Sequence, residues 1–182
     1  MALKTLKDEI VDEVSTILSG SFDIEVTKTS RVPHSDDTAI TFPNLDDETQ
    51  SVKLIETCVL YVDMRRSTQL SMQHKPHTVA KLYSSFVRAM TRCASEYGAE
   101  VRGIIGDRVM MIFDEKNCFT NSVKTAQLIN SVCKHVMNKH FSHSDLSFGI
   151  GIDFDSKNVA LSLAGIFFLW LSHWPKFKGN QS

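Results

Sequence analysis

The sequence predicts an α+β domain of the ferredoxin-like type, an antiparallel sheet with helices on one face, preceded by an N-terminal helix. Short apolar runs typical of strands alternate with longer segments whose apolar residues recur every three or four positions. Their order is strand, helix, strand, strand, helix, strand, the βαββαβ pattern. The chain has 182 residues, of which 42% are hydrophobic, and this is enough to bury one core.

The chain begins with an amphipathic segment and a polar connector. Apolar residues recur at spacings of three and four from Leu3 to Leu18, which predicts a helix over residues 1–20. Residues 21–54 are rich in polar side chains and contain two prolines, so they predict a solvated connector with one strand at Ile24–Thr27. We expect no chemistry from the connector.

The predicted core spans residues 55–153. Its first strand, Thr57–Asp63, is a nearly unbroken apolar run, which is typical of a central strand covered on both faces. Periodicity and glycine positions predict the other elements: a helix over Pro76–Tyr97, strands over Glu100–Ile105 and Val109–Phe113, a helix over Phe119–Lys139 and a strand over Leu146–Ile152. Several unrelated functions share this order, so topology alone does not select one.

Composition excludes several classes of function. The formal net charge of -1 gives no general attraction to nucleic acid or to an anionic membrane, so a phosphate ligand must be held locally. The four cysteines form no Cys-x-x-Cys pair, which argues against a zinc site or a disulfide framework and favours the cytoplasm. No signal peptide is predicted, and the apolar run Val159–Leu171 is shorter than the roughly 18 residues of a membrane span.

Two aspartates form the predicted centre of function. Asp63 ends the first core strand and Asp107 lies in the turn between the next two strands. In a ferredoxin-like sheet this hairpin neighbours the first strand, so both carboxylates can lie at one end of the sheet. Hard divalent cations such as Mg²⁺ prefer carboxylate and phosphate oxygens. Either aspartate alone can be an ordinary turn residue, so the prediction depends on the pair.

The turn after the first aspartate is a predicted phosphate site. A hydroxyl-rich turn with two arginines and several backbone N–H groups can hold phosphate oxygens. Its residues are Met64, Arg65, Arg66, Ser67 and Thr68. The signal is weaker than a P-loop because no glycine-rich loop is present.

Three stretches in this order resemble the class III adenylyl and guanylyl cyclase homology domain, namely CVLYVDMRRST (58–68), GAEVRGIIGDRVMMIF (98–113) and LSFGIGID (146–153). The resemblance implies that Asp63 and Asp107, with Met64, hold two Mg²⁺ or Mn²⁺ ions, and that the turn through Thr68 contacts a triphosphate. It also implies a homodimer in which metal-binding residues of one subunit face base and phosphate contacts of the other.

The nucleotide base is inferred from a departure from that family. Purine-specific members carry a base-reading lysine four residues before the second aspartate, where this chain has Gly103 beside Arg102. In this respect the chain is similar to the pyrimidine cyclases of bacterial Pycsar antiphage systems, which make cyclic UMP or cyclic CMP for a separate effector protein. Arginine only donates hydrogen bonds and uracil offers acceptors, so UTP is favoured over CTP, which stays open. Arg102 can equally be a solvated strand residue, and strand alternation separates it from Gly103 unless the strand bulges.

The C-terminal segment, residues 154–182, departs from the family. The family continues with an asparagine and an arginine that contact the ribose and the transition-state phosphate, whereas this chain has no arginine after Arg108. The segment resembles a truncated or frame-disrupted tail. A catalytically inactive cyclase fold that serves as a dimerisation module therefore stays open beside the enzyme.

Two other functions are disfavoured. An RNA-recognition module of the same topology needs aromatic residues on its central strands, and the third strand offers only Phe113. A diguanylate cyclase needs a glycine-glycine-acid hairpin, where this chain has Ile105, Gly106 and Asp107. The sequence thus predicts a metal-dependent enzyme that converts UTP to 3′,5′-cyclic UMP and pyrophosphate, without nucleic acid or membrane insertion.

Overall fold

The computed structural model describes residues 2–33 and 49–161. The helices are α1 (Ala2–Ile17), α2 (Ser67–Gln73), α3 (Pro76–Glu96), α4 (Cys118–Val132) and α5 (Asn138–His140), with a π-helical segment η3 (Cys133–Met137) between the last two. The strands are β1 (Asp23–Lys28), β2 (Thr49–Met64), β3 (Ala99–Ile105), β4 (Arg108–Phe113) and β5 (Phe148–Leu161). Each helix and strand predicted from the sequence is present with shifted ends. Within these ranges, no helix is long and apolar enough to cross a membrane.

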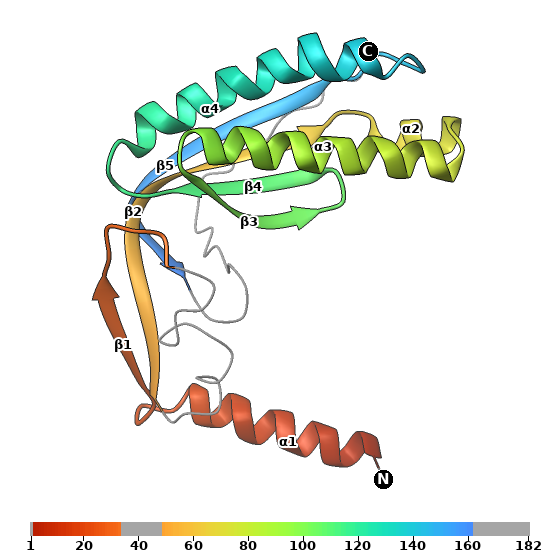
Figure 1. Cartoon of the computed structure of the whole chain (residues 1–182). Coiled ribbons are helices and arrows are strands. Elements are labelled where there is room, and N and C mark those ends of the chain that lie inside the picture. Colours follow the sequence, from red (N-terminus) through yellow and green to blue (C-terminus); the bar gives the residue numbers. More distant parts are fainter. Residues whose placement is uncertain (1, 34–48, 162–182) are drawn as a thin grey trace, which may run out of the picture.

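The core sheet confirms the ferredoxin-like class. Strand β2 lies between β5 and β4, and β3 pairs with β4, with all of these pairs antiparallel. Helices α3 and α4 lie across one face of this sheet (Figure 1). The central place of β2 explains its nearly continuous apolar sequence, because a central strand is covered on both faces.

The helices bury the larger of two hydrophobic clusters against the sheet. Leu60 and Val62, alternate residues of β2, are fully buried in it together with Phe86 and Met90 of α3 and Ile129 of α4. The spacing of two on the strand and of four on the helix places each pair on one side of its element. The two periodicities that predicted the elements therefore meet in one core.

The opposite face of the sheet carries a smaller cluster. Val59 of β2 and Ile112 of β4 pack there with Val32, which follows β1. The backbone N–H of Val32 donates to Oδ1 of Asp114 at 2.7 Å. The segment that follows β1 is thus packed on the sheet through the apolar side chain of Val32.

Strand β2 continues beyond the core and forms an arm with β1. Its first residues pair with β1 in parallel, from Asp23 opposite Thr49 to Lys28 opposite Leu54. The pairing of β2 with β5 shifts between Ile55 and Thr57, and a shift of this kind bends a strand. The sequence predicts the start of β2, residues 49–54, as part of the connector, because polar residues there hide the strand pattern. Strand β5 likewise continues past the predicted core boundary at residue 153.

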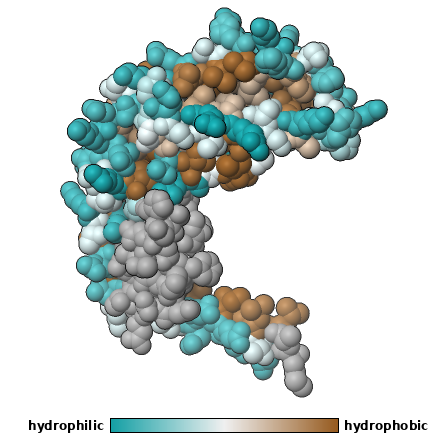
Figure 2. Space-filling model, viewed as in Figure 1, coloured by the Kyte–Doolittle hydropathy of each residue, from teal (hydrophilic) through white to brown (hydrophobic). Residues whose placement is uncertain are grey.

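Helix α1 lies at the far end of this arm, away from α3 and α4 (Figure 1). Its apolar side chains are exposed, for example 50% for Leu6 and 49% for Ile10. Figure 2 shows the resulting apolar surface along the helix. The predicted amphipathic pattern is therefore present, but the core described here does not bury it. Residues 162–182 of the atypical tail lie outside the described residues.

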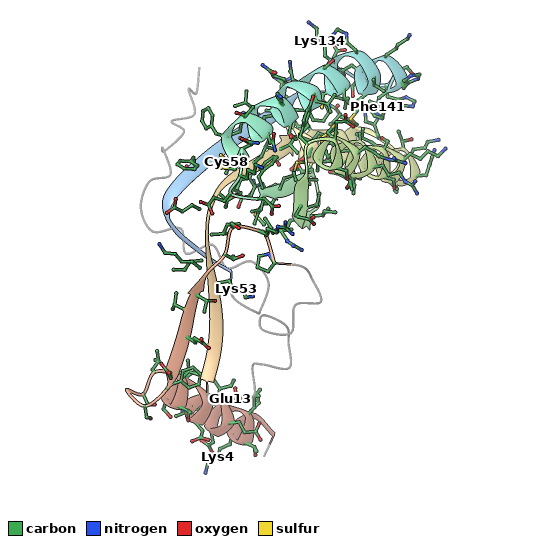
Figure 3. All side chains as sticks on the ribbon, turned by 60° about the vertical axis from the view of Figure 1, so that its left-hand side comes forward. Lys4, Glu13, Lys53, Cys58, Lys134 and Phe141 are labelled. Atoms are coloured by element: carbon green, nitrogen blue, oxygen red, sulfur yellow. The ribbon has the colours of Figure 1, made fainter. Side chains whose placement is uncertain are left out.

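All four cysteines are buried and none forms a disulfide. Burial raises the pKa of the Cys58 thiol to about 11 and that of Cys133 to about 12. Figure 3 shows Cys58 on β2 among the side chains that pack under the helices. The cysteines therefore act as small core residues, since a protonated, buried thiol is unreactive.

Candidate active site

The end of β2 and the β3–β4 turn bring the two aspartates to one end of the sheet. Asp63 stands opposite Arg108, the first residue of β4, and Asp107 immediately precedes that residue. The backbone N–H of Met64 donates to the carbonyl oxygen of Asp107 at 3.1 Å, which ties the strand end to the turn. Gly106, the other turn residue, has φ 61°, a conformation that glycine adopts without strain.

The proximity of the two carboxylates is expressed in the pKa of Asp63. Burial raises this pKa, and the negative charge of Asp107 raises it further, while Arg108 and Arg65 lower it. The Nε atom of Arg108 lies 3.7 Å from Oδ1 of Asp63, and the two side chains are 54% and 39% exposed. Two carboxylates that repel each other at a partly exposed strand end favour the binding of a cation.

The donor set fits hard divalent cations. Two carboxylates supply the oxygen ligands that Mg²⁺ and Mn²⁺ take, and the resemblance adds the main-chain carbonyl of Met64, directly after Asp63. Within residues 2–33 and 49–161 no group of three or more His, Cys, Asp or Glu side chains could hold a metal. The pair therefore fits an ion shared with a phosphate ligand, and a closed protein cage is absent from this part of the chain.

The turn after Asp63 has a backbone conformation of its own. Arg66 adopts φ 59° and ψ 28°, the left-handed region, directly before α2. For a residue with a side chain this conformation costs about 1 to 2 kcal/mol. Ser67 and Thr68 then form the first turn of α2, with Leu70 donating its N–H to the Arg66 carbonyl oxygen at 3.0 Å. The hydroxyl-rich turn thus continues into a short helix that the sequence does not predict.

The side chain of Arg65 lies against Gly149 of β5. Gly149 stands opposite Asp63 in the β2–β5 ladder. A Cβ atom on Gly149 would come within 2.7 Å of Nε of Arg65. The guanidinium therefore occupies the space that a larger residue at position 149 would fill.

Comparisons with known proteins bear on the family. No protein-family model matches the chain. The chain is 27% identical over 126 residues to a uridylate cyclase from Burkholderia cepacia, and 27% identical over 124 residues to one from Xanthomonas perforans. These matches cover 69% and 68% of this chain but only 52% and 50% of the relatives. The chain thus spans about half the length of the curated relatives it matches.

Solved structures agree with these relatives. A bacterial light-regulated adenylyl cyclase matches with a TM-score of 0.51 and 27% identity, over 56% of this chain and 54% of that one. An adenylyl cyclase from P. aeruginosa shares the fold with a TM-score of 0.50 at 22% identity, over 52% of this chain and 53% of that one. The chain carries a class III nucleotide cyclase domain. The family resemblance and the fold class inferred from the sequence are confirmed.

Two residues near the aspartates of this cyclase domain were not identified from the sequence. Arg108 forms the ion pair with Asp63, and Tyr61 lies two residues before Asp63, hence on the same face of β2. Burial raises the pKa of Tyr61, and the charge of Arg108 lowers it. The alternation of side chains along the strand could have placed Tyr61 on the same face as Asp63. The position of Arg108 opposite Asp63 follows only from the antiparallel register of β2 and β4.

The predicted base-reading residues of the cyclase domain lie on β3. Its pairing with β4 shifts between Val101 and Gly103, which leaves Arg102 as the extra residue of a bulge. The Nη2 atom of Arg102 donates to the carbonyl oxygen of Pro33. A Cβ on Gly103 would lie 3.5 Å from Cε of Met110, an ordinary contact. The bulge that the base-reading hypothesis requires is therefore present, and the Arg102 head group is held by the segment after β1.

Proposed function

We propose that this cyclase domain converts UTP to 3′,5′-cyclic UMP and pyrophosphate, with two Mg²⁺ or Mn²⁺ ions as cofactors. The observation that carries the proposal is the placement of Asp63 and Asp107 at one end of the sheet, directly before the turn that begins at Met64. Relatives named uridylate cyclase support uridine as the nucleoside. The alternative is CTP as the substrate, with cyclic CMP as the product.

In this proposal the metal ions are held by the carboxylates of Asp63 and Asp107 and by the main-chain carbonyl of Met64. Bound ions supply activation of the 3′-hydroxyl and neutralisation of the leaving phosphates. The raised pKa of Asp63 supports this assignment, because the repulsion between the carboxylates favours a cation between them.

The reaction forms a bond between the 3′-oxygen and the α-phosphorus. The bond from that phosphorus to the pyrophosphate oxygen breaks, pyrophosphate leaves with the electron pair, and the hydroxyl proton is released. Negative charge therefore grows on the leaving group. We assign its binding to the turn after Asp63, through the Arg65 and Arg66 side chains and the backbone and hydroxyls of Ser67 and Thr68.

We assign the base to the β3 bulge. Arg102 offers only hydrogen-bond donors, which suit the O2 and O4 acceptors of uracil, and Gly103 leaves the adjacent surface without a side chain. Because Arg102 donates to the Pro33 carbonyl oxygen in this structure, base binding exchanges one acceptor for another. The cost of freeing the guanidinium is thereby offset in part.

The cellular role proposed here follows the resemblance to Pycsar cyclases. A cytoplasmic homodimer would produce cyclic UMP during phage infection, and the nucleotide would act on a separate effector protein. The family resemblance implies active sites between two subunits. Each subunit would then contribute its two aspartates to one of the two sites.

The test is to incubate the purified chain with MnCl₂ and each of the four ribonucleoside triphosphates and to identify products by mass. Cyclic UMP from UTP, lost in Asp107→Ala, is the expected result. Cyclic CMP alone would select the alternative substrate. No product from any nucleotide, with the circular dichroism of a folded chain, would favour the inactive dimerisation module.

A further inference from the structure

The backbone around the site directs Arg65 across β5. Arg65 follows Asp63 by two residues, and its backbone N–H donates to the carbonyl oxygen of Ser147 at 2.7 Å, just before β5 begins. Gly149, the second residue of β5, stands opposite Asp63. A Cβ at Gly149 would lie 2.7 Å from Nε, 2.9 Å from Nη2 and 3.0 Å from Cζ of Arg65. The whole guanidinium thus rests where a side chain at position 149 would begin.

This route brings a second cation to the aspartate pair. Arg108 approaches Asp63 from β4, with Nε 3.7 Å from Oδ1. Arg65 lies over β5, which flanks β2 on the edge opposite β4. The two arginines therefore approach Asp63 from opposite sides of β2. Arg108 of β4 is thus ion-paired with Asp63, whereas Arg65 is positioned by its contact with Gly149 of β5.

We propose that Gly149 is a positioning residue of the cyclase site, whose missing side chain lets the Arg65 guanidinium reach the leaving pyrophosphate. This inference rests on the proposed function. A planar guanidinium can donate two hydrogen bonds to phosphate oxygens and stabilise the charge that develops as the phosphorus–oxygen bond breaks. Arg65 would supply this charge from the same subunit as the aspartates.

Gly151 provides a matched control on the same strand. It lies two residues after Gly149, hence on the same face of β5, and stands opposite Tyr61. A Cβ there meets nothing within 4 Å, whereas one at Gly149 meets Arg65. Neither glycine has a positive φ, so alanine fits both backbones. Because the atoms near position 149 belong to the flexible end of a side chain, Gly149→Ala displaces Arg65 and leaves the strand in place.

The test is a double-mutant cycle between Gly149→Ala and Arg65→Ala, read as kcat and KM for UTP. We expect each single variant to lose roughly 10²-fold in kcat, the scale of one lost charge-stabilising contact. The double variant should be no slower than Arg65→Ala alone, because both changes remove the same contact. Gly151→Ala should keep the wild-type rate. Multiplied losses in the double variant would overturn the positioning role.

A binding measurement separates this inference from the proposed function. Calorimetric titration with inorganic pyrophosphate and Mg²⁺ requires no turnover, and Gly149→Ala and Arg65→Ala should weaken binding together while Gly151→Ala does not. Wild-type affinity in Gly149→Ala would overturn the proposal. If the wild-type chain made no cyclic UMP but still bound pyrophosphate in this pattern, the proposed function would fail and the positioning role would stand. The double variant, which lacks the clash, controls for misfolding of Gly149→Ala.

Discussion

Met64 donates its backbone N–H to the carbonyl oxygen of Asp107 at 3.1 Å, and this hydrogen bond joins the end of β2 to the β3–β4 turn. Asp107 is thereby held by Met64, the residue that directly follows Asp63. The turn depends on Gly106, whose φ of 61° is unfavourable for a residue with a Cβ.

Replacing Gly106 should therefore affect both stability and activity. Gly106→Ala is expected to lower the free energy of unfolding by about 1 to 2 kcal/mol, the cost of a left-handed residue with a side chain. Cyclase activity should fall as well, because the shifted turn carries Asp107. Urea unfolding and product formation measure the two effects. Gly20→Ala, at an exposed position without positive φ, is the control and should change neither.

The repulsion between Asp63 and Asp107 predicts a conflict between stability and function. Burial and the charge of Asp107 raise the pKa of Asp63 in the folded chain. Asp63→Asn removes this carboxylate, so the metal-free variant should be more stable than the metal-free wild type at neutral pH. Activity should be lost. The sign follows from the titration: a carboxylate with a raised pKa destabilises the fold above that pKa and is neutral below it.

The pH dependence provides the check. The stability gain of Asp63→Asn over wild type should shrink as the pH falls through the raised pKa, because protonated Asp63 carries no charge to remove. Asp23→Asn, at an exposed position of β1 opposite the other end of β2, is the matched control and should give no gain of this kind. A variant at position 63 that is less stable at every pH would contradict the prediction.

Metal binding should be measurable without nucleotide turnover. Mg²⁺ or Mn²⁺ should raise the melting temperature of the wild-type chain, because a ligand that binds only the folded state stabilises it by about 2.7 kcal/mol at a hundredfold excess over its dissociation constant. Asp63→Asn and Asp107→Asn should lose this shift. A wild-type melting temperature that stays constant in both metals would count against the carboxylate pair as the metal site.

The core elements could be predicted because their signals are local. Leu60 and Val62 alternate on β2, and Phe86 and Met90 recur at a spacing of four on α3, so single segments carry their own burial pattern. The hairpin followed from Gly106 and Asp107 for the same reason. Element order then placed both aspartates at one end of the sheet, since the topology leaves few alternatives.

The features that were missed depend on register or on long-range pairing. Strand β1 was predicted, but its parallel pairing with β2 was not, because the first residues of β2 lie in a polar region where no local pattern marks a strand. Helix α2 has Leu70 as its one buried residue, too few for a periodicity. The contact between Arg65 and Gly149 arises because β5 pairs with β2 in one particular register. Sequence spacing cannot reveal such a contact, although the alternating glycines of β5 mark the place.

The choice of base gives a prediction on Arg102. Its guanidinium offers only donors, and the β3 bulge frees it from strict strand alternation. Arg102→Gln introduces a carbonyl oxygen that can accept from the amino group of cytosine. We therefore expect the ratio of kcat/KM for UTP to that for CTP to fall roughly tenfold, the lower end of the discrimination of a good base contact.

Competition between UTP and CTP in one reaction, with both cyclic products quantified by mass, measures this ratio directly. Arg92→Gln, at an exposed position on α3, is the control and should leave the ratio unchanged. Because Arg102 also donates to the Pro33 carbonyl oxygen, a loss of stability in Arg102→Gln would lower both rates together. A ratio that stays at the wild-type value while both rates fall would therefore assign Arg102 to holding the connector, and base reading to other residues.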